Sequence, residues 1–144
     1  MSSYILVGHN YPEKKWWNEI VRACAIVDDV FEIHCWSDES AEVKAALHFG
    51  HKVTSTWREG TVIRGRITKE FLSFLTETPK PQDREIYNKM TPFFTIIFGN
   101  TLHSEHYGTE IIISRVIRER ERSIDRILDQ MEDVATVHRN IRCH

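Results

Sequence analysis

The chain has 144 residues, 41% of them hydrophobic and 28% charged, a composition that is typical of folded globular proteins and excludes a disordered chain. Its 19 Lys and Arg nearly balance its 21 Asp and Glu, so it lacks the basic field of nucleic-acid-binding proteins, and we do not expect nucleic acid as a partner. Its three cysteines show no CxxC spacing and indicate neither a disulfide framework nor a zinc ribbon. At this length we expect one domain over residues 1–144.

The first two predicted elements are a strand and a helix. Residues 3–9, SYILVGH, are continuously apolar at their centre and predict a buried strand. Residues 14–29 carry apolar side chains at helical spacing and predict a helix that packs by one face. Because adjacent residues of a helix point in different directions, Trp16 and Trp17 cannot share that face. We therefore expect one of these two rings to be at least half exposed.

The next strand and helix follow directly. Residues 30–36, VFEIHCW, alternate in character and predict a half-buried strand. One face of that strand would carry Phe31, Ile33 and Cys35, and the other Glu32 and His34. Residues 37–50 predict a helix, because they are rich in Ala and begin with Ser37 or Asp38 as a candidate N-cap.

Residues 61–68 alternate again, and they place Arg64 and Arg66 on the outward face of a strand. Two neighbouring guanidinium groups are suited to binding phosphate. The chain has no Gly-rich phosphate loop, however, so the role of these arginines stays open. Thr68 is the predicted N-cap of a short helix at residues 69–77, which ends before a proline-rich connection.

The C-terminal third contains two apolar strands and the longest predicted helix. Residues 92–99, PFFTIIFG, are apolar on both faces, and we expect a central strand that is covered on both sides. Residues 109–116 predict another strand. A helix from Val116 to about Val137 follows, with an apolar stripe that is explained most simply by packing on the sheet. A homodimer through this C-terminal helix is an alternative use of the stripe.

Together these elements predict a single layered domain of the α/β (or α+β) class. We expect a central sheet of about five strands, flanked by three to four helices and completed by the long C-terminal helix. No apolar run reaches the length of a signal-sequence core or a membrane span, so we expect a cytoplasmic protein without membrane contact.

A polar connection, FGNTLHSEHYGTE at residues 98–110, lies between two of the most apolar segments of the chain. His103 and His106 form an HxxH pair around Glu105, and these residue types bind zinc or act as general acid and base. The pair is not on a predicted helix, spacing identifies no third ligand, and His9 would reach the connection only if the strand ends are neighbours. We therefore assign no catalytic residue, no metal ligand and no cofactor. A small hydrolase that uses His103, Glu105 and His106, with or without zinc, is the alternative.

The same connection is suited to contact with another protein. Long connections rich in His, Glu and Tyr are common contact surfaces. We predict partner-binding residues at Asn100, His103, Glu105, His106 and Tyr107. A third interpretation stays open, in which the connection is polar only because its backbone meets water.

In its size, its α/β layout and its lack of enzyme motifs, the chain resembles the cytoplasmic immunity proteins that bacteria pair with contact-dependent or secreted toxins. The resemblance implies a binding protein, or inhibitor, that neutralises a partner toxin enzyme by protein–protein contact. It also implies that Glu105, His106 and Tyr107 would occlude the active site of the toxin.

Overall fold

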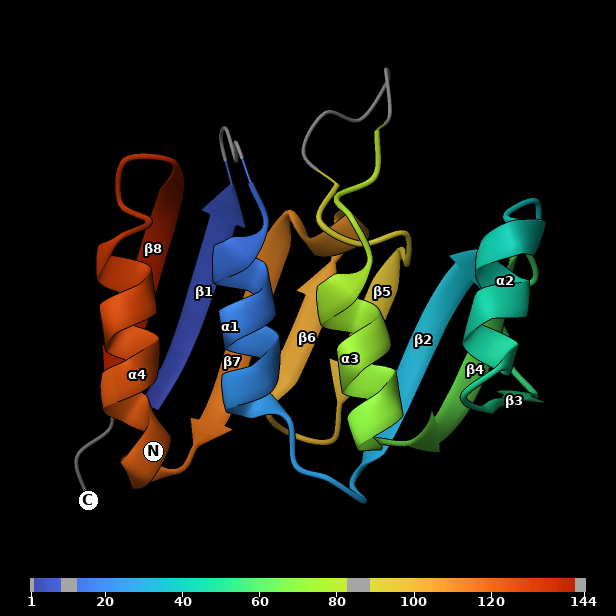
Figure 1. Cartoon of the computed structure of the whole chain (residues 1–144), viewed down its shortest axis with the longest axis horizontal. Helices are drawn as coiled ribbons and strands as arrows, with labels where there is room; N and C mark the ends of the chain where they lie inside the picture. The colour runs from blue at the N-terminus through green and yellow to red at the C-terminus, as the bar shows by residue number, and fades with distance from the viewer. Residues whose placement is uncertain (1, 9–12, 83–88, 142–144) are drawn as a thin grey trace.

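The computed structural model describes residues 2–8, 13–82 and 89–141, whose arrangement is shown in Figure 1. His9, considered above as a third ligand, lies outside the described residues. The described strands are β1 Ser2–Gly8, β2 Val30–Trp36, β3 His51–Val53, β4 Gly60–Arg66, β5 Thr95–Phe98, β6 Leu102–Glu105, β7 Glu110–Val116 and β8 Ala135–Ile141. The described helices are α1 Lys15–Cys24, α2 Ser40–Leu47, α3 Lys69–Glu77 and α4 Arg118–Asp129, with one 3₁₀ turn, η1 His106–Gly108.

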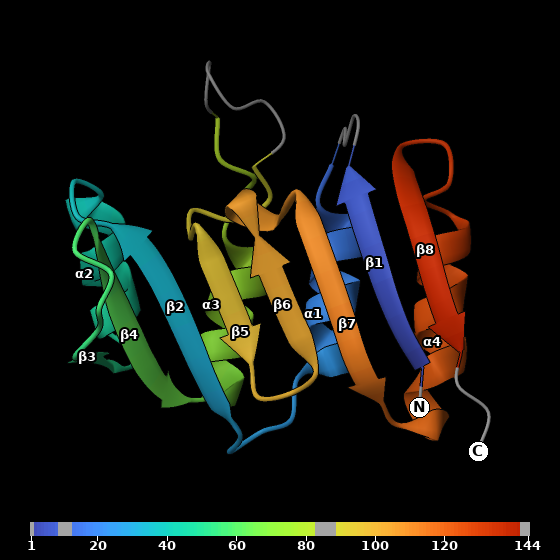
Figure 2. The same cartoon turned by 180° about the vertical axis from the view of Figure 1, so that it is seen from behind.

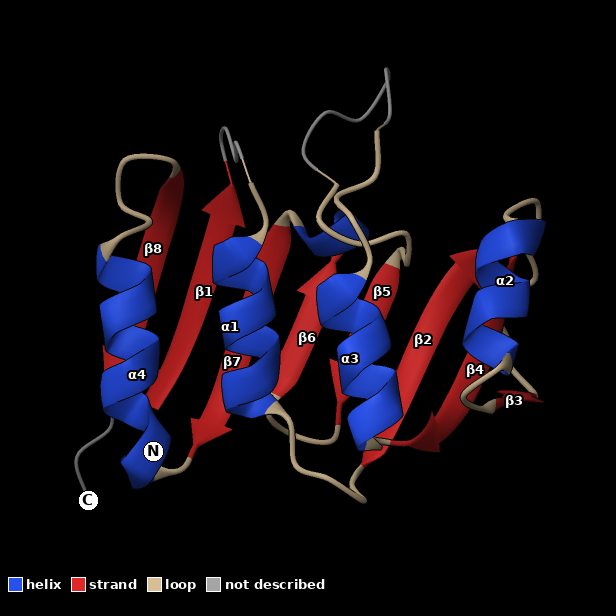
Figure 3. Ribbon diagram, in the orientation of Figure 1, coloured by secondary structure: helices blue, strands red, loops and turns tan. Residues whose placement is uncertain are grey.

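These strands form one sheet in the order β3-β4-β2-β5-β6-β7-β1-β8, and every neighbouring pair is antiparallel. All four α-helices lie on the same face of the sheet (Figures 1 and 3), and the view from behind shows the strands in front of the helices (Figure 2). The fold is therefore a two-layer α+β arrangement, with a sheet larger than the predicted five strands. None of the described helices combines the length and the apolar character that a membrane crossing requires.

The end of the chain differs most from the prediction. The expected long C-terminal helix is wrong, because α4 ends at Asp129 and the chain then turns back to form β8. Arg139 of β8 donates to the Asp129 carboxylate at 2.6 Å, which ties this last strand to the end of α4. The stripe of α4 is buried within its own chain through Ile124, Ile127 and Leu128. A homodimer through α4 would therefore have to use other residues of that helix.

The hydrophobic core lies between the helices and the sheet. Phe31 of β2 stacks on Phe71 of α3 with their ring centroids 4.0 Å apart, and both residues are fully buried. Ile33 and Cys35 follow Phe31 into the core, whereas Glu32 and His34 face away from it. The alternation predicted for this strand is confirmed.

Helix α1 is buried more widely than its apolar stripe predicts. The exposed fractions of Trp16 and Trp17 are 5% and 0%, so the expectation that one ring is half exposed is wrong. The helix packs against α3 on one side and α4 on the other, which removes its flanks as well as its inner face from water (Figure 1). The Trp17 indole also donates to the Ser104 hydroxyl of β6 at 3.4 Å, which connects the two layers.

Side chains cap both ends of α3. The Thr68 hydroxyl accepts a hydrogen bond from the N–H of Phe71 at 3.1 Å, which confirms the predicted N-cap. At the other end, the Lys14 ammonium donates to the carbonyls of Leu75 at 2.9 Å and Thr78 at 2.6 Å. Lys14 is buried in this position, and burial lowers its pKa from 10.5 to about 8.

The start of α2 differs from the prediction. Ser37 and Asp38 are not the N-cap, because the helix begins at Ser40 and Glu39 is the N-cap residue without a side-chain cap. The Glu39 carboxylate accepts a hydrogen bond from the Tyr107 hydroxyl at 2.9 Å instead. This acidic residue therefore links α2 to the connection between β6 and β7.

Strand β5 is central in the sheet, as predicted, but helices cover only one of its faces. Ile96 and Phe98 are buried beneath the helical layer. Ile97 points to the opposite face and is only half-buried. The predicted cover on both sides is therefore found at Thr95, which is buried beside Glu105, but not at Ile97. The side without helices continues across the neighbouring strands.

Candidate functional site on the open face of the sheet

We name the face opposite the helices the open face. Its central row runs across seven strands, and each residue in it is the register partner of the next: Arg64, Glu32, Ile97, His103, Ile112, Ile5 and His138. Three isoleucines therefore lie within the row, between charged or polar side chains at its ends, and His103 separates Ile97 from Ile112. Successive residues of a strand point to opposite faces, so this row is positioned by the same backbone that positions the core.

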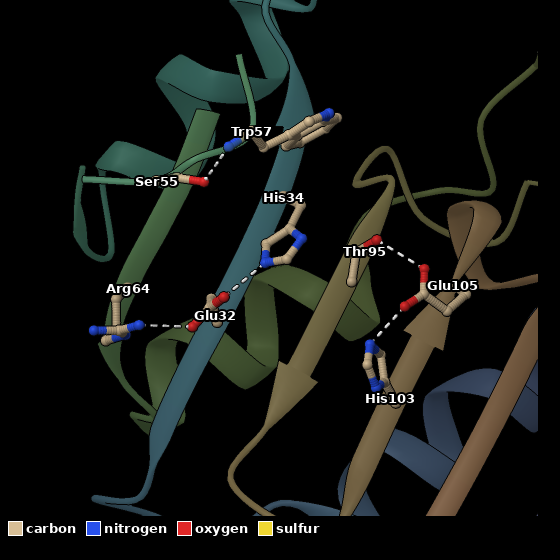
Figure 4. Close-up of polar contacts among 8 residues, drawn as sticks. All are labelled: Glu32, His34, Ser55, Trp57, Arg64, Thr95, His103 and Glu105. Carbon is tan, nitrogen blue, oxygen red and sulfur yellow. Dashed lines mark hydrogen bonds and ion pairs between the residues drawn. The ribbon is translucent and has the colours of Figure 1, made fainter. Parts of the chain in front are cut away.

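One polar group on this face, the Glu32 cluster, consists of Glu32, His34 and Arg64 (Figure 4). Glu32 Oε1 lies 2.7 Å from His34 Nε2, and Glu32 Oε2 accepts from Arg64 Nη2 at 2.9 Å. Partial burial by itself would raise the pKa of Glu32, but the hydrogen bonds from His34 and Arg64 outweigh it and hold the pKa below its ordinary value. Glu32 is therefore ionised at neutral pH and bridges the two other side chains.

A groove of about 390 Å³ lies beside the Glu32 cluster. Its floor is formed by β2 and β4, and its wall by Val53 of β3 and by residues 54–57, which lead from β3 toward β4. In that wall the Ser55 hydroxyl accepts a hydrogen bond from the backbone N–H of Trp57 at 3.0 Å (Figure 4). The Trp57 ring covers Gly60, where an added Cβ would lie 2.0 Å from a ring carbon, so only glycine allows this close approach.

The second polar group, the Glu105 cluster, consists of Thr95, His103 and Glu105. His103 Nε2 lies 2.5 Å from Glu105 Oε1, and Thr95 donates to Glu105 Oε2 at 2.9 Å. Figure 4 shows both groups on the same side of the sheet. His103 and Glu105 belong to a strand rather than to the polar loop that the sequence predicts, and their side chains are 41% and 26% exposed.

His106 and Tyr107 follow in a strained turn. Both have left-handed backbone angles, with φ of 50° and 61°, which is costly for residues with a Cβ. His106 is exposed and pairs with Glu110 at 3.2 Å. Tyr107 is buried, and its pKa is raised well above the ordinary value by burial and by the hydrogen bond to Glu39. Its backbone N–H donates to the carbonyl of Phe94 at 3.0 Å, so Tyr107 holds the turn against the segment that leads into β5.

The five predicted partner-binding residues do not form one loop. Asn100 is exposed in the turn before β6, whereas His106 and Tyr107 lie beyond the other end of that strand. Only His103 and Glu105 lie along the open face itself. The predicted contact surface is thus divided by β6, and its exposed polar part is the Glu105 cluster together with His106.

The geometry gives no support to a metal or hydrolytic centre in this region. His103 and His106 are held by two different carboxylates, those of Glu105 and Glu110, and do not converge on one point. Within residues 2–8, 13–82 and 89–141, no three His, Cys, Asp or Glu side chains gather closely enough to hold a metal ion. Burial raises the pKa of the Cys35 thiol to about 12, so it is almost entirely protonated at neutral pH.

Sequence patterns do not identify the Glu32 cluster and Trp57 as one site. The alternation of residues 30–36 and of residues 61–68 shows that Glu32, His34 and Arg64 face outward, but it does not show that β2 and β4 are neighbours. Trp57 lies in a connection without a periodic pattern. An outward carboxylate, imidazole and guanidinium on adjacent predicted strands is the signal that could have indicated the site.

No protein-family model, no curated protein and no solved structure matches the chain.

Proposed function

We propose that this chain is a binding protein that neutralises a partner toxin enzyme by direct contact, and that the open face is its contact surface. One observation supports this most strongly: all four α-helices lie on the same face of the sheet, and the described residues place no helix on the other face. A sheet that is packed on one side has a stiff backbone, so its free side presents side chains in fixed positions.

The open face is large enough for specific recognition of a protein. Eight strands at a spacing of about 4.8 Å make it about 35 Å wide, and strands of three to seven residues are about 10–23 Å long. The resulting area of roughly 600–800 Å² is close to the roughly 800 Å² that each partner contributes to a standard protein–protein interface.

The chemistry of the face also agrees with that of an interface. Ile5 and Val7 are 42% and 38% exposed, the half-buried Ile112 continues this apolar strip toward the centre, and the half-buried Ile97 lies beyond His103. The Glu32 cluster lies on one side of the strip and the His106–Glu110 pair at its end. Exposed apolar side chains flanked by polar groups are common in protein interfaces.

The choice of a toxin enzyme as partner rests on the resemblance to immunity proteins, and it is tested separately from the surface. The protein encoded next to this chain would be co-expressed with it, and the complex would be isolated and its dissociation constant measured by calorimetry. Absence of a complex with that neighbour would remove the support for a toxin as partner.

A matched pair of variants tests the surface. Ile112→Arg places a charge at the centre of the open face and is expected to weaken the complex by about 30-fold or more, because central apolar contacts dominate binding. Ile117→Arg makes the same change at a 48%-exposed residue at the start of α4 and is expected to leave the affinity almost unchanged. The opposite pattern would assign binding to the helical layer and reject the open face.

A further inference from the structure

We infer that the groove beside the Glu32 cluster binds a carboxylate side chain of the partner, with Arg64 as the anchor. This inference rests on the proposed function, since it specifies one contact of the open face. It assigns a role to an arginine that the sequence leaves unexplained.

Arg64 has donors to spare. Only its Nη2 nitrogen donates to Glu32, at 2.9 Å, and the other guanidinium nitrogens have no hydrogen-bond partner among the residues that the structure describes. The side chain is 49% exposed at the groove, so a partner can reach it. A planar guanidinium with two free N–H groups matches the two oxygens of a carboxylate. Glu32 meanwhile restrains the rotation of the Arg64 side chain, which lowers the entropy lost on binding.

The groove supplies further groups of the right kind. The Ser55 hydroxyl uses its oxygen to accept from Trp57, and its own proton has no acceptor among the described residues. Thr54 and Thr56 line the same wall and add two hydroxyl groups. The Trp57 ring gives an apolar side to the groove, against which the methylene groups of an acidic side chain would pack. Trp and Arg are also the residue types that most often dominate the energy of protein interfaces.

The local charge favours a carboxylate over a phosphate. Arg64 carries one positive charge, and the neighbouring Glu32 cancels it at neutral pH, since hydrogen bonds hold the pKa of Glu32 low. A phosphate dianion would therefore meet the Glu32 carboxylate without a surplus of positive charge, whereas a carboxylate brings only one negative charge. Arg66 does not add to the groove, because its Nη1 donates to the Asp28 carbonyl at 2.8 Å and it does not line the wall.

Two short peptides test this inference on the intact chain. The probes are N-acetyl-Ala-Ala-Glu-Ala-Ala-amide and its Gln counterpart, and binding is followed by NMR at the side-chain N–H signals of Arg64 and Trp57. The Glu peptide is expected to bind about 10-fold more tightly than the Gln peptide, as for a charge-assisted hydrogen bond, with both affinities in the millimolar range. Arg64→Gln is expected to remove this preference.

Arg66→Gln is the matched control and is expected to retain the preference, since Arg66 is an outward arginine of the same strand outside the groove. Arg64→Lys keeps the charge but loses the planar fork, and it is expected to lose most of the preference. Inorganic phosphate is the competing probe. Equal binding of the two peptides, an effect of Arg66→Gln as large as that of Arg64→Gln, or tighter binding of phosphate than of the Glu peptide would each overturn the inference.

Failure of this inference and failure of the proposed function give different experimental results. If the peptides fail to discriminate while Ile112→Arg still disrupts the partner complex, the open face remains the contact surface and only the carboxylate anchor is rejected. If the peptides discriminate while Ile112→Arg has no effect on the complex, the groove binds carboxylates and the proposed contact surface is wrong.

Discussion

On the covered face of the sheet, β2 buries Phe31, Ile33 and Cys35 against the helical layer, whereas on the open face of the same strand Glu32 and His34 remain partly in water. The residues that stabilise the fold and those available for recognition therefore alternate along one backbone. This arrangement separates the two roles, because a substitution on one face leaves the packing of the other largely in place.

The largest expected effect on the free energy of unfolding comes from replacing a large side chain by alanine on the covered face, and the same change on the open face is the comparison. Phe31→Ala leaves a cavity beneath Phe71 and is expected to lower the free energy of unfolding by about 3–5 kcal/mol. Ile97→Ala, at the half-buried centre of the open face, is expected to cost only about 1 kcal/mol, since water already reaches that side chain. Urea unfolding followed by circular dichroism measures both values. Similar losses for the two variants would mean that the open face is packed rather than free.

A second test uses the buried amine of the helical layer. The pKa of Lys14 is about 8 in the folded chain and 10.5 when the amine is in water, so between these values the unfolded chain holds more protons. The free energy of unfolding contributed by this group therefore rises as the pH increases from 8 to 10.5, by on the order of 3 kcal/mol in total. Lys14→Met is expected to remove this rise. Lys15→Met, at an exposed neighbour, is the control and should keep it.

The smallest expected effect on the free energy of unfolding comes from Glu32 on the open face. The pKa of Glu32 is held below its ordinary value of 4.5, so its contribution to the free energy of unfolding is complete above pH 4.5 and is lost as the pH falls through the lower, folded-state value. We expect this contribution to be about 1 kcal/mol, because the cluster is partly solvated. Glu32→Gln should reduce the acid sensitivity of unfolding by that amount. A loss of several kcal/mol would show that this cluster is structural and not reserved for a partner.

Sequence patterns predict the elements that bury one regular face. The helix at residues 69–77 is observed with the predicted bounds, because its cap and its apolar spacing agree. β6 is missed because its inward residues include Ser104, a polar side chain that is fully buried by its contact with Trp17, so no apolar alternation is visible. β8 is missed because the apolar spacing of α4 continues through Met131 and Val134, and neither Gly nor Pro marks the end of that helix.

The candidate site depends on contacts that no local pattern contains. Glu32 and Arg64 are 32 positions apart and meet only because β2 and β4 pair in one particular register. The groove needs, in addition, the fold of residues 53–57 over Gly60, which is set by the shape of the Trp57 ring. For the predicted contact residues, the sequence correctly indicates that His103, Glu105 and His106 reach water, but not that Tyr107 is buried by its own chain.

The pairing of β8 with β1 extends over seven register positions, from Ser2 with Ile141 to Gly8 with Ala135. Among residues 135–140 only Ala135 is buried, so removal of these residues would cost little packing. It would, however, expose the edge of β1. The run of Tyr, Ile, Leu and Val in β1 is typical of edge strands that pair with strands of other molecules. β8 thus protects the edge of β1. Proteolytic removal of the residues after Val134 would first cause the protein to precipitate rather than to unfold.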